Sequence, residues 1–138
     1  MKYFVLDASV TLAWLIDRAA PPYAARIRQL LLAGDRAVVP ALWRLEIANA
    51  FLVAERRGLL TTSDTAEILQ SFYSGIARSI EESQQVLPLQ RVLASARQFH
   101  LTAYDAEYLD TARTQELPLA TLDRQLEKAA LQAGVPLL

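Results

Sequence analysis

The sequence contains no cysteine, and His100 is its one histidine. The lack of cysteine excludes disulfide frameworks, zinc knuckles, iron–sulfur sites and cysteine nucleophiles. A histidine metal cage or a Ser-His-Asp arrangement would depend on His100 alone, and this residue stands at a predicted helix end. Glycine is scarce, at 4 residues, and no glycine-rich motif that cradles phosphates is present.

Neither sign of charge dominates the chain. The sequence has 14 basic and 15 acidic residues and a net charge of −1. This balance excludes a protein that coats nucleic acid through bulk charge, so any nucleic-acid contact requires local patches. No apolar run approaches the roughly 18 residues of a membrane span, and the apolar start is too short for a secretory core. We therefore expect a cytoplasmic protein with no membrane partner.

The composition is that of a folded globular protein. Hydrophobic residues make up 53% of the 138 positions, and no repeat, linker or change of composition divides the chain. A chain of this length is typical of one domain. We therefore predict a single domain over residues 1–138.

Short apolar segments alternate with segments of helical periodicity. The predicted strands are residues 3–6, 37–39, 118–121 and 135–138, with a further short strand near 78–83. The predicted helices are residues 8–16, 22–33, 40–56, 88–99, 103–116 and 123–133, and one more that Thr62-Ser63-Asp64 caps. This alternation favours an α/β fold with a mostly parallel sheet.

Four acidic residues stand directly after strands or near the starts of helices in this predicted fold. Asp7 comes directly after the first strand and Asp123 after residues 118–121, while Glu46 and Asp105 lie near the starts of two helices. Ligands bind at the carboxyl ends of parallel strands, so these acids are expected to converge there. Carboxylates held together raise one another's pKa unless a cation neutralises them. Oxygen ligands without histidine or cysteine select Mg²⁺ or Mn²⁺, which can assist phosphodiester hydrolysis.

Each acid also has an ordinary structural explanation. Asp7 and Asp123 fit helix N-caps, and Asp105 fits a first-turn acid that interacts with the helix dipole. Glu46 is harder to explain in this way, because it stands among apolar residues, where an unpaired carboxylate is costly. Asn49 shares its helix face. The residues alone leave both explanations open.

Four segments together resemble the motif blocks of PIN domains, and most of all those of the VapC toxins of bacterial and archaeal toxin–antitoxin pairs. They read VLDAS (5–9), PALWRLEIAN (40–49), LTAYDAEYL (101–109) and LATLD (119–123). The resemblance covers nearly the whole chain, and it implies a PIN-like α/β fold with a central sheet of four or five short strands flanked by helices. It also implies an acidic quartet that holds Mg²⁺, with Mn²⁺ able to substitute, and three supporting polar residues. The quartet is Asp7, Glu46, Asp105 and Asp123, and the supporting residues are Ser9, Asn49 and Thr121.

The function implied by this resemblance is a Mg²⁺-dependent endoribonuclease that acts as the toxin of a toxin–antitoxin pair. Such a protein is expected to form a homodimer and to bind a small VapB-like antitoxin, for which helices 22–32 and 42–53 would supply a groove. The alternative is a PIN-like module that has lost catalysis and binds RNA or protein. The number of metal ions, the general base and the RNA that is cut stay open.

Asp110 departs from the family pattern, which usually has a small apolar residue at this position. On a helix it lies about 140° around the axis from Asp105. We therefore expect Asp110 to be a surface or interface acid.

Overall fold

The computed structural model describes residues 1–17 and 19–138 and contains one parallel sheet of four strands, in the order β3-β2-β1-β4. The strands are β1 (Tyr3–Leu6), β2 (Arg36–Val39), β3 (Ile80–Glu82) and β4 (Leu119–Ala120). Val5 pairs with Val38 on one side and with Leu119 on the other, so β1 lies in the middle. The continuous apolar runs of β1 and β2 suit strands covered on both faces.

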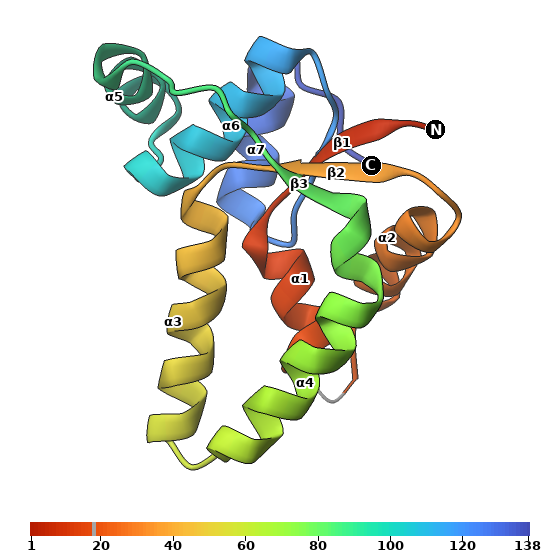
Figure 1. The fold of residues 1–138 in the computed structure, drawn as a ribbon. Coiled ribbons are helices and arrows are strands. Elements are labelled where there is room, and N and C mark those ends of the chain that lie inside the picture. Colours follow the sequence, from red (N-terminus) through yellow and green to blue (C-terminus); the bar gives the residue numbers. More distant parts are fainter. Residues whose placement is uncertain (18) are drawn as a thin grey trace.

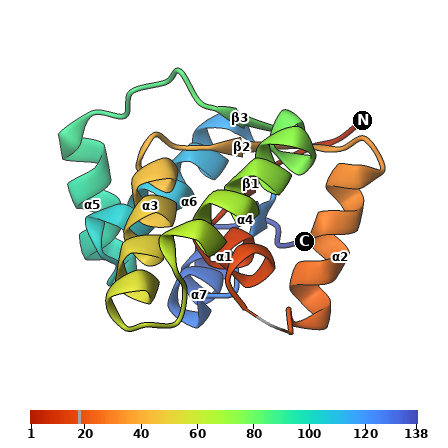
Figure 2. The ribbon, with the colours of Figure 1, turned by 60° about the horizontal axis from the view of Figure 1, so that its bottom comes forward.

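Helices surround this sheet. The described helices are α1 (Ala8–Leu15), α2 (Pro22–Leu32), α3 (Leu42–Arg56), α4 (Thr62–Ser74), α5 (Leu89–Phe99), α6 (Ala103–Gln115) and α7 (Arg124–Gln132), with a short 3₁₀ turn, η1 (Ile76–Ser79). Helices α3 and α4 extend away from the sheet and are joined at their far end (Figure 1). Helix α1 lies between α2 and α3 and packs against both (Figure 2). The predicted α/β fold with a parallel sheet is confirmed.

Several element ends differ from the sequence prediction. Residues 135–138 do not form a full strand, because Leu137 makes only an isolated bridge to Leu119. Helix α3 begins at Leu42 rather than at Pro40. The cap of α4 is Thr61, whose hydroxyl accepts from the Asp64 amide while the Asp64 carboxylate accepts from the Thr61 amide. The short strand predicted near residues 78–83 is present as β3.

The core joins the sheet to the helices on both of its sides. Phe4 and Leu6 of β1 are buried together with Ile27 of α2, Tyr108 of α6 and Leu126 of α7. This packing fixes the carboxyl end of β1 relative to the helices around it. Within the described residues, no helix combines the length and apolar character needed to cross a membrane.

The prediction for Asp110 is wrong, because its side chain is fully buried. Its Oδ1 atom accepts a hydrogen bond of 2.7 Å from the Ser95 hydroxyl and lies 3.5 Å from Nη1 of Arg113. The rotation around α6 places Asp110 away from Asp105, but α5 packs on that face of α6 and covers it. The positions of residues around α6 alone do not show which face of that helix α5 covers.

Ser95→Ala should lower the free energy of unfolding by about 1–3 kcal/mol, because it removes the hydroxyl that donates to Oδ1 of the buried Asp110 carboxylate. Urea denaturation measures this change. Ser63→Ala is the matched control, since Ser63 also lies in a helix but is exposed. An equal effect of the two substitutions would contradict the importance of the Ser95–Asp110 hydrogen bond.

Candidate functional site

Asp7 stands at the carboxyl end of β1, and its carboxylate is held by two hydroxyl groups. The side chain is 5% exposed, and its Oδ2 atom accepts from Ser9 Oγ at 2.6 Å and from Thr121 Oγ1 at 2.8 Å. Asp7 occupies the N-cap position of α1, but its side chain makes no capping hydrogen bond. Capping therefore does not explain why this position carries a buried carboxylate.

The segment after β4 is tied to the same hydroxyl groups. The Leu122 amide donates to Ser9 Oγ, and the Asp123 amide donates to Thr121 Oγ1, both at 3.0 Å. Asp123 begins α7, and its Oδ1 atom accepts from the Leu126 amide at 3.0 Å. The helix-cap explanation is therefore correct for one oxygen of Asp123. The same loop brings this acid close to Asp7.

Glu46 and Asp105 approach the site from α3 and α6. Glu46 is half-buried, and its Oε1 atom accepts a hydrogen bond of 2.6 Å from the Tyr108 hydroxyl. Asp105 lies in the first turn of α6, where its amide donates to the N-cap Thr102. Asn49 is exposed, and it lies one turn along α3 from Glu46.

The pKa shifts show that these acids affect one another. Burial raises the pKa of Asp7, and nearby Asp123 raises it further, while the hydroxyls of Ser9 and Thr121 act in the opposite direction. Burial also raises the pKa of Glu46, and the charge of Asp7 adds to this effect. The pKa of Asp105 rises to about 6, first through burial and then through repulsion by the other three acids. The structure therefore brings the four predicted acids within electrostatic reach of one another.

No basic side chain neutralises this cluster within the described part of the chain. The ion pairs found there join Arg36 to Glu81, Arg44 to Glu82 and Arg113 to Asp110. The four acids take part in none of them. Gathered carboxylates without a counter-ion create a local negative potential that favours cation binding.

The arrangement is open rather than a closed cage. Among residues 1–17 and 19–138, no group of three or more His, Cys, Asp or Glu side chains is already placed to hold a metal ion. Mg²⁺ in proteins usually keeps several waters and uses only one or two carboxylates, often with substrate phosphates as further ligands. An oxygen-only donor set without a paired cation fits an ion bound in this way.

Two tyrosines that contact the site were not predicted as site residues. Tyr108 follows Asp105 by three positions on α6, so helical spacing contained a signal that it faces the same side. The hydroxyl of Tyr23 accepts a hydrogen bond of 3.3 Å from the Thr121 amide. Tyr23 precedes that residue by 98 positions, and no local pattern relates the two.

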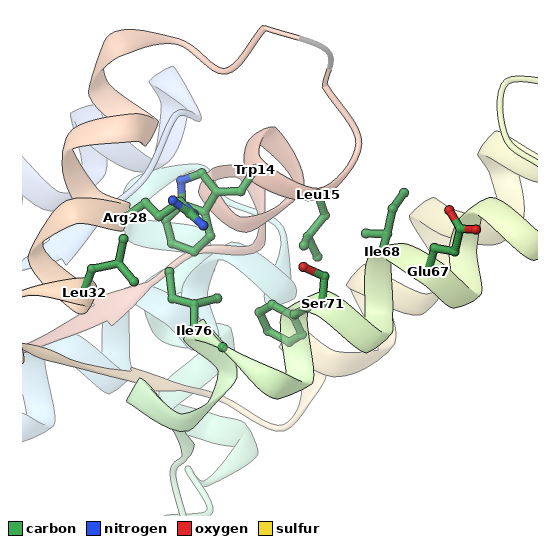
Figure 3. A pocket seen from close by; sticks show the side chains of 10 residues that line it. Trp14, Leu15, Arg28, Leu32, Glu67, Ile68, Ser71 and Ile76 are labelled. Carbon is green, nitrogen blue, oxygen red and sulfur yellow. The ribbon is translucent and has the colours of Figure 1, made fainter.

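Helices α2 and α3, which were expected to supply a groove for an antitoxin segment, are separated by α1 (Figure 2). Each helix instead borders its own hollow together with α4. The hollow beside α2 has a volume of about 530 Å³ and is also lined by α1 (Figure 3). The hollow beside α3 has a volume of about 300 Å³ and an apolar lining that includes Phe51 and Phe72. Neither hollow is lined by the four acids.

Comparison with known proteins agrees with this fold. The structure of PAE2754 from Pyrobaculum aerophilum superposes with a TM-score of 0.70 at 24% sequence identity, covering 94% of this chain and 84% of that one. The structure of FitAcB from Neisseria gonorrhoeae superposes with a TM-score of 0.64 at 18% identity, covering 100% and 96%. At these identities the similarity establishes the fold. No curated protein matches the sequence significantly.

The family model of the PIN domain matches residues 4–131. This range contains all four acids of the candidate site and all four strands except the first residue of β1. The chain therefore belongs to the PIN domain family.

Proposed function

We propose that this protein is a Mg²⁺-dependent endoribonuclease of the VapC type, the toxin of a toxin–antitoxin pair. PIN domains are generally metal-dependent nucleases. The observation that carries the proposal is the buried carboxylate of Asp7, which two hydroxyls hold near three further acids, with no neutralising cation among residues 1–17 and 19–138. A structural role alone does not account for this concentration of negative charge.

The quartet Asp7, Glu46, Asp105 and Asp123 would hold the ion, Mg²⁺ or in its place Mn²⁺. Bound there, the ion would supply Lewis-acid chemistry to the attack of water on an RNA phosphodiester. Ser9 and Thr121 fix the Asp7 carboxylate by donating hydrogen bonds to it. Asn49, on the same side of α3 as Glu46, is proposed as a further supporting residue.

RNA cleavage by the purified protein should require Mg²⁺ or Mn²⁺ and stop when a chelator is added. Asp7→Asn and Asp105→Asn should each lower the rate by about 100-fold or more, since even outer-shell changes cost metal sites up to about 100-fold. Asp17→Asn, an exposed change outside the quartet, should leave the rate unchanged. An RNA cleavage assay with circular dichroism of each variant tests this. Wild-type rates in both site variants would favour the alternative of a non-catalytic RNA- or protein-binding module.

The raised pKa of Asp105 makes stability depend on pH in a defined window. Its pKa of about 6 in the fold exceeds the ordinary value of 3.8, so the ionised form destabilises the folded state. This destabilisation is absent below pH 3.8 and complete above a pH of about 6. Metal-free wild type should therefore lose stability relative to Asp105→Asn as the pH rises through this window.

Mg²⁺ should reverse that loss, because it binds the ionised carboxylates of the folded chain. At 100 times the dissociation constant it should add about 2.7 kcal/mol to the free energy of unfolding, and less as the pH falls below about 6. Thermal melts of wild type and Asp105→Asn, with and without Mg²⁺ between pH 4 and 7.5, measure both effects. If the melting midpoints of the two proteins changed with pH and Mg²⁺ in the same way, Asp105 would not belong to a shared cluster of charged carboxylates.

We also propose, from the resemblance to VapC toxins, that the protein acts in the cytoplasm as a homodimer and that a small VapB-like antitoxin neutralises it. The hollow between α1, α2 and α4 suits an amphipathic segment of this partner. Figure 3 shows apolar side chains along it, with Arg28 beside Trp14 at one end and Glu67 beside Ile68 at the other. A segment with apolar residues between an acid and a base would match this lining.

Leu32→Glu should weaken binding of the small protein encoded next to this chain by about tenfold or more, because it places a charge among the apolar side chains that line part of this hollow. Leu32 is 53% exposed, so the folded chain tolerates the change. Leu131→Glu, on α7 and 63% exposed, is the matched control. Co-purification and rescue from growth arrest measure the interaction. Equal binding by both variants would show that the partner does not bind at the hollow between α1, α2 and α4.

A further inference from the structure

The contact between Tyr108 and Glu46 is short and joins distant parts of the chain. The Tyr108 hydroxyl donates to Oε1 of Glu46 at 2.6 Å across a separation of 62 residues. This length is typical of a charge-assisted bond from a hydroxyl to a carboxylate. Within the described residues, no other hydrogen bond to the Glu46 side chain is found.

Packing leaves the phenol of Tyr108 little freedom. The side chain is fully buried and lies in the core beside β1 and α7. Helix α6, which carries it, packs against β1, α5 and α7, whereas α3, which carries Glu46, packs on α1. The hydrogen bond therefore joins a half-buried carboxylate on α3 to a hydroxyl donor on α6 whose side chain is fully buried.

Two residues on one turn of α6 contribute to the site. Asp105 and Tyr108 are three residues apart, a spacing that places side chains on one side of a helix. Asp105 contributes its own charge to the site, and Tyr108 holds the charge of Glu46 near it. One oxygen of Glu46 is occupied by the phenol, and the other is left for a further partner.

We propose that Tyr108 is a positioning residue that orients the Glu46 carboxylate for binding of a divalent cation at the quartet. This inference rests on the proposed metal-dependent function and assigns a role to a residue outside the acidic quartet. It is not a core contact alone, because a phenylalanine would fill the same space without the hydroxyl. The hydroxyl is proposed to act through Glu46, to which it donates.

Tyr108→Phe removes this hydroxyl and keeps the ring. It should raise the dissociation constant for Mn²⁺ by about tenfold, the lower end of the range for outer-shell partners of metal ligands. The Mg²⁺ concentration for half-maximal RNA cleavage should rise similarly, while the rate at saturating Mg²⁺ falls less. Tyr104→Phe, on the same helix and 64% exposed, is the matched control and should change neither quantity.

A double-mutant cycle separates positioning from folding. In a Glu46→Gln background, Tyr108→Phe should have no further effect on Mn²⁺ affinity, because the carboxylate that it orients is gone. Electron paramagnetic resonance of free Mn²⁺ gives the affinities, and a thermal melt without metal confirms that each variant is folded. An unchanged Mn²⁺ affinity in Tyr108→Phe would overturn the proposal, and so would an equal loss in both backgrounds.

The outcomes also distinguish this inference from the proposed function. Wild type that binds Mn²⁺ without cutting RNA would refute the nuclease, while the Mn²⁺ affinities would still decide the role of Tyr108. Cleavage that needs Glu46 but is indifferent to Tyr108→Phe at every Mg²⁺ concentration would refute the role of Tyr108 alone. Wild type that binds no divalent cation would refute both.

Discussion

The carboxylate of Asp7 is the constraint on which the rest of the site depends, because it is buried, lies near other acids and pairs with no cation in the part of the chain that the structure describes. Burial and repulsion both disfavour its charged form. Two hydroxyl donors, from Ser9 and Thr121, offset part of this cost and fix the position of the carboxylate. Those hydroxyls in turn accept from the amides of Leu122 and Asp123, so the loop after β4 is shaped around the same group.

The order of the strands explains why acids from distant segments meet. With β1 between β2 and β4, the carboxyl end of β1 lies beside the loop that carries Asp123 and near the helix that follows β2 and carries Glu46. Asp105 does not follow a strand. It lies at the amino end of α6, which packs on β1. Parallel strands all have their carboxyl ends at one edge of a sheet, so residues that follow different strands lie close together there. When these residues are acids, their carboxylates repel one another.

Helix α6 carries two buried polar contacts with different consequences. On one side Tyr108 donates to Glu46, and on another Asp110 accepts from Ser95. The first contact orders a group at the site, whereas the second fixes α5 on α6. In each contact a hydroxyl of a neighbouring helix donates to a carboxylate that packing removes partly or wholly from water, which offsets part of the cost of that burial.

The sequence by itself determined the parallel α/β class and the order of the elements, because apolar runs and helical periodicity are local patterns. It indicated the four acids as a set only through the resemblance to PIN domains, since the residues alone left a helix-cap explanation open. It did not determine the partners of those acids. Tyr108 and Tyr23 reach the site across long separations, and the burial of Asp110 depends on the packing of α5. The separation of α2 and α3 by α1 likewise follows from how helices stack on the sheet. Such contacts are set by tertiary packing, which brings together side chains that no periodic pattern relates.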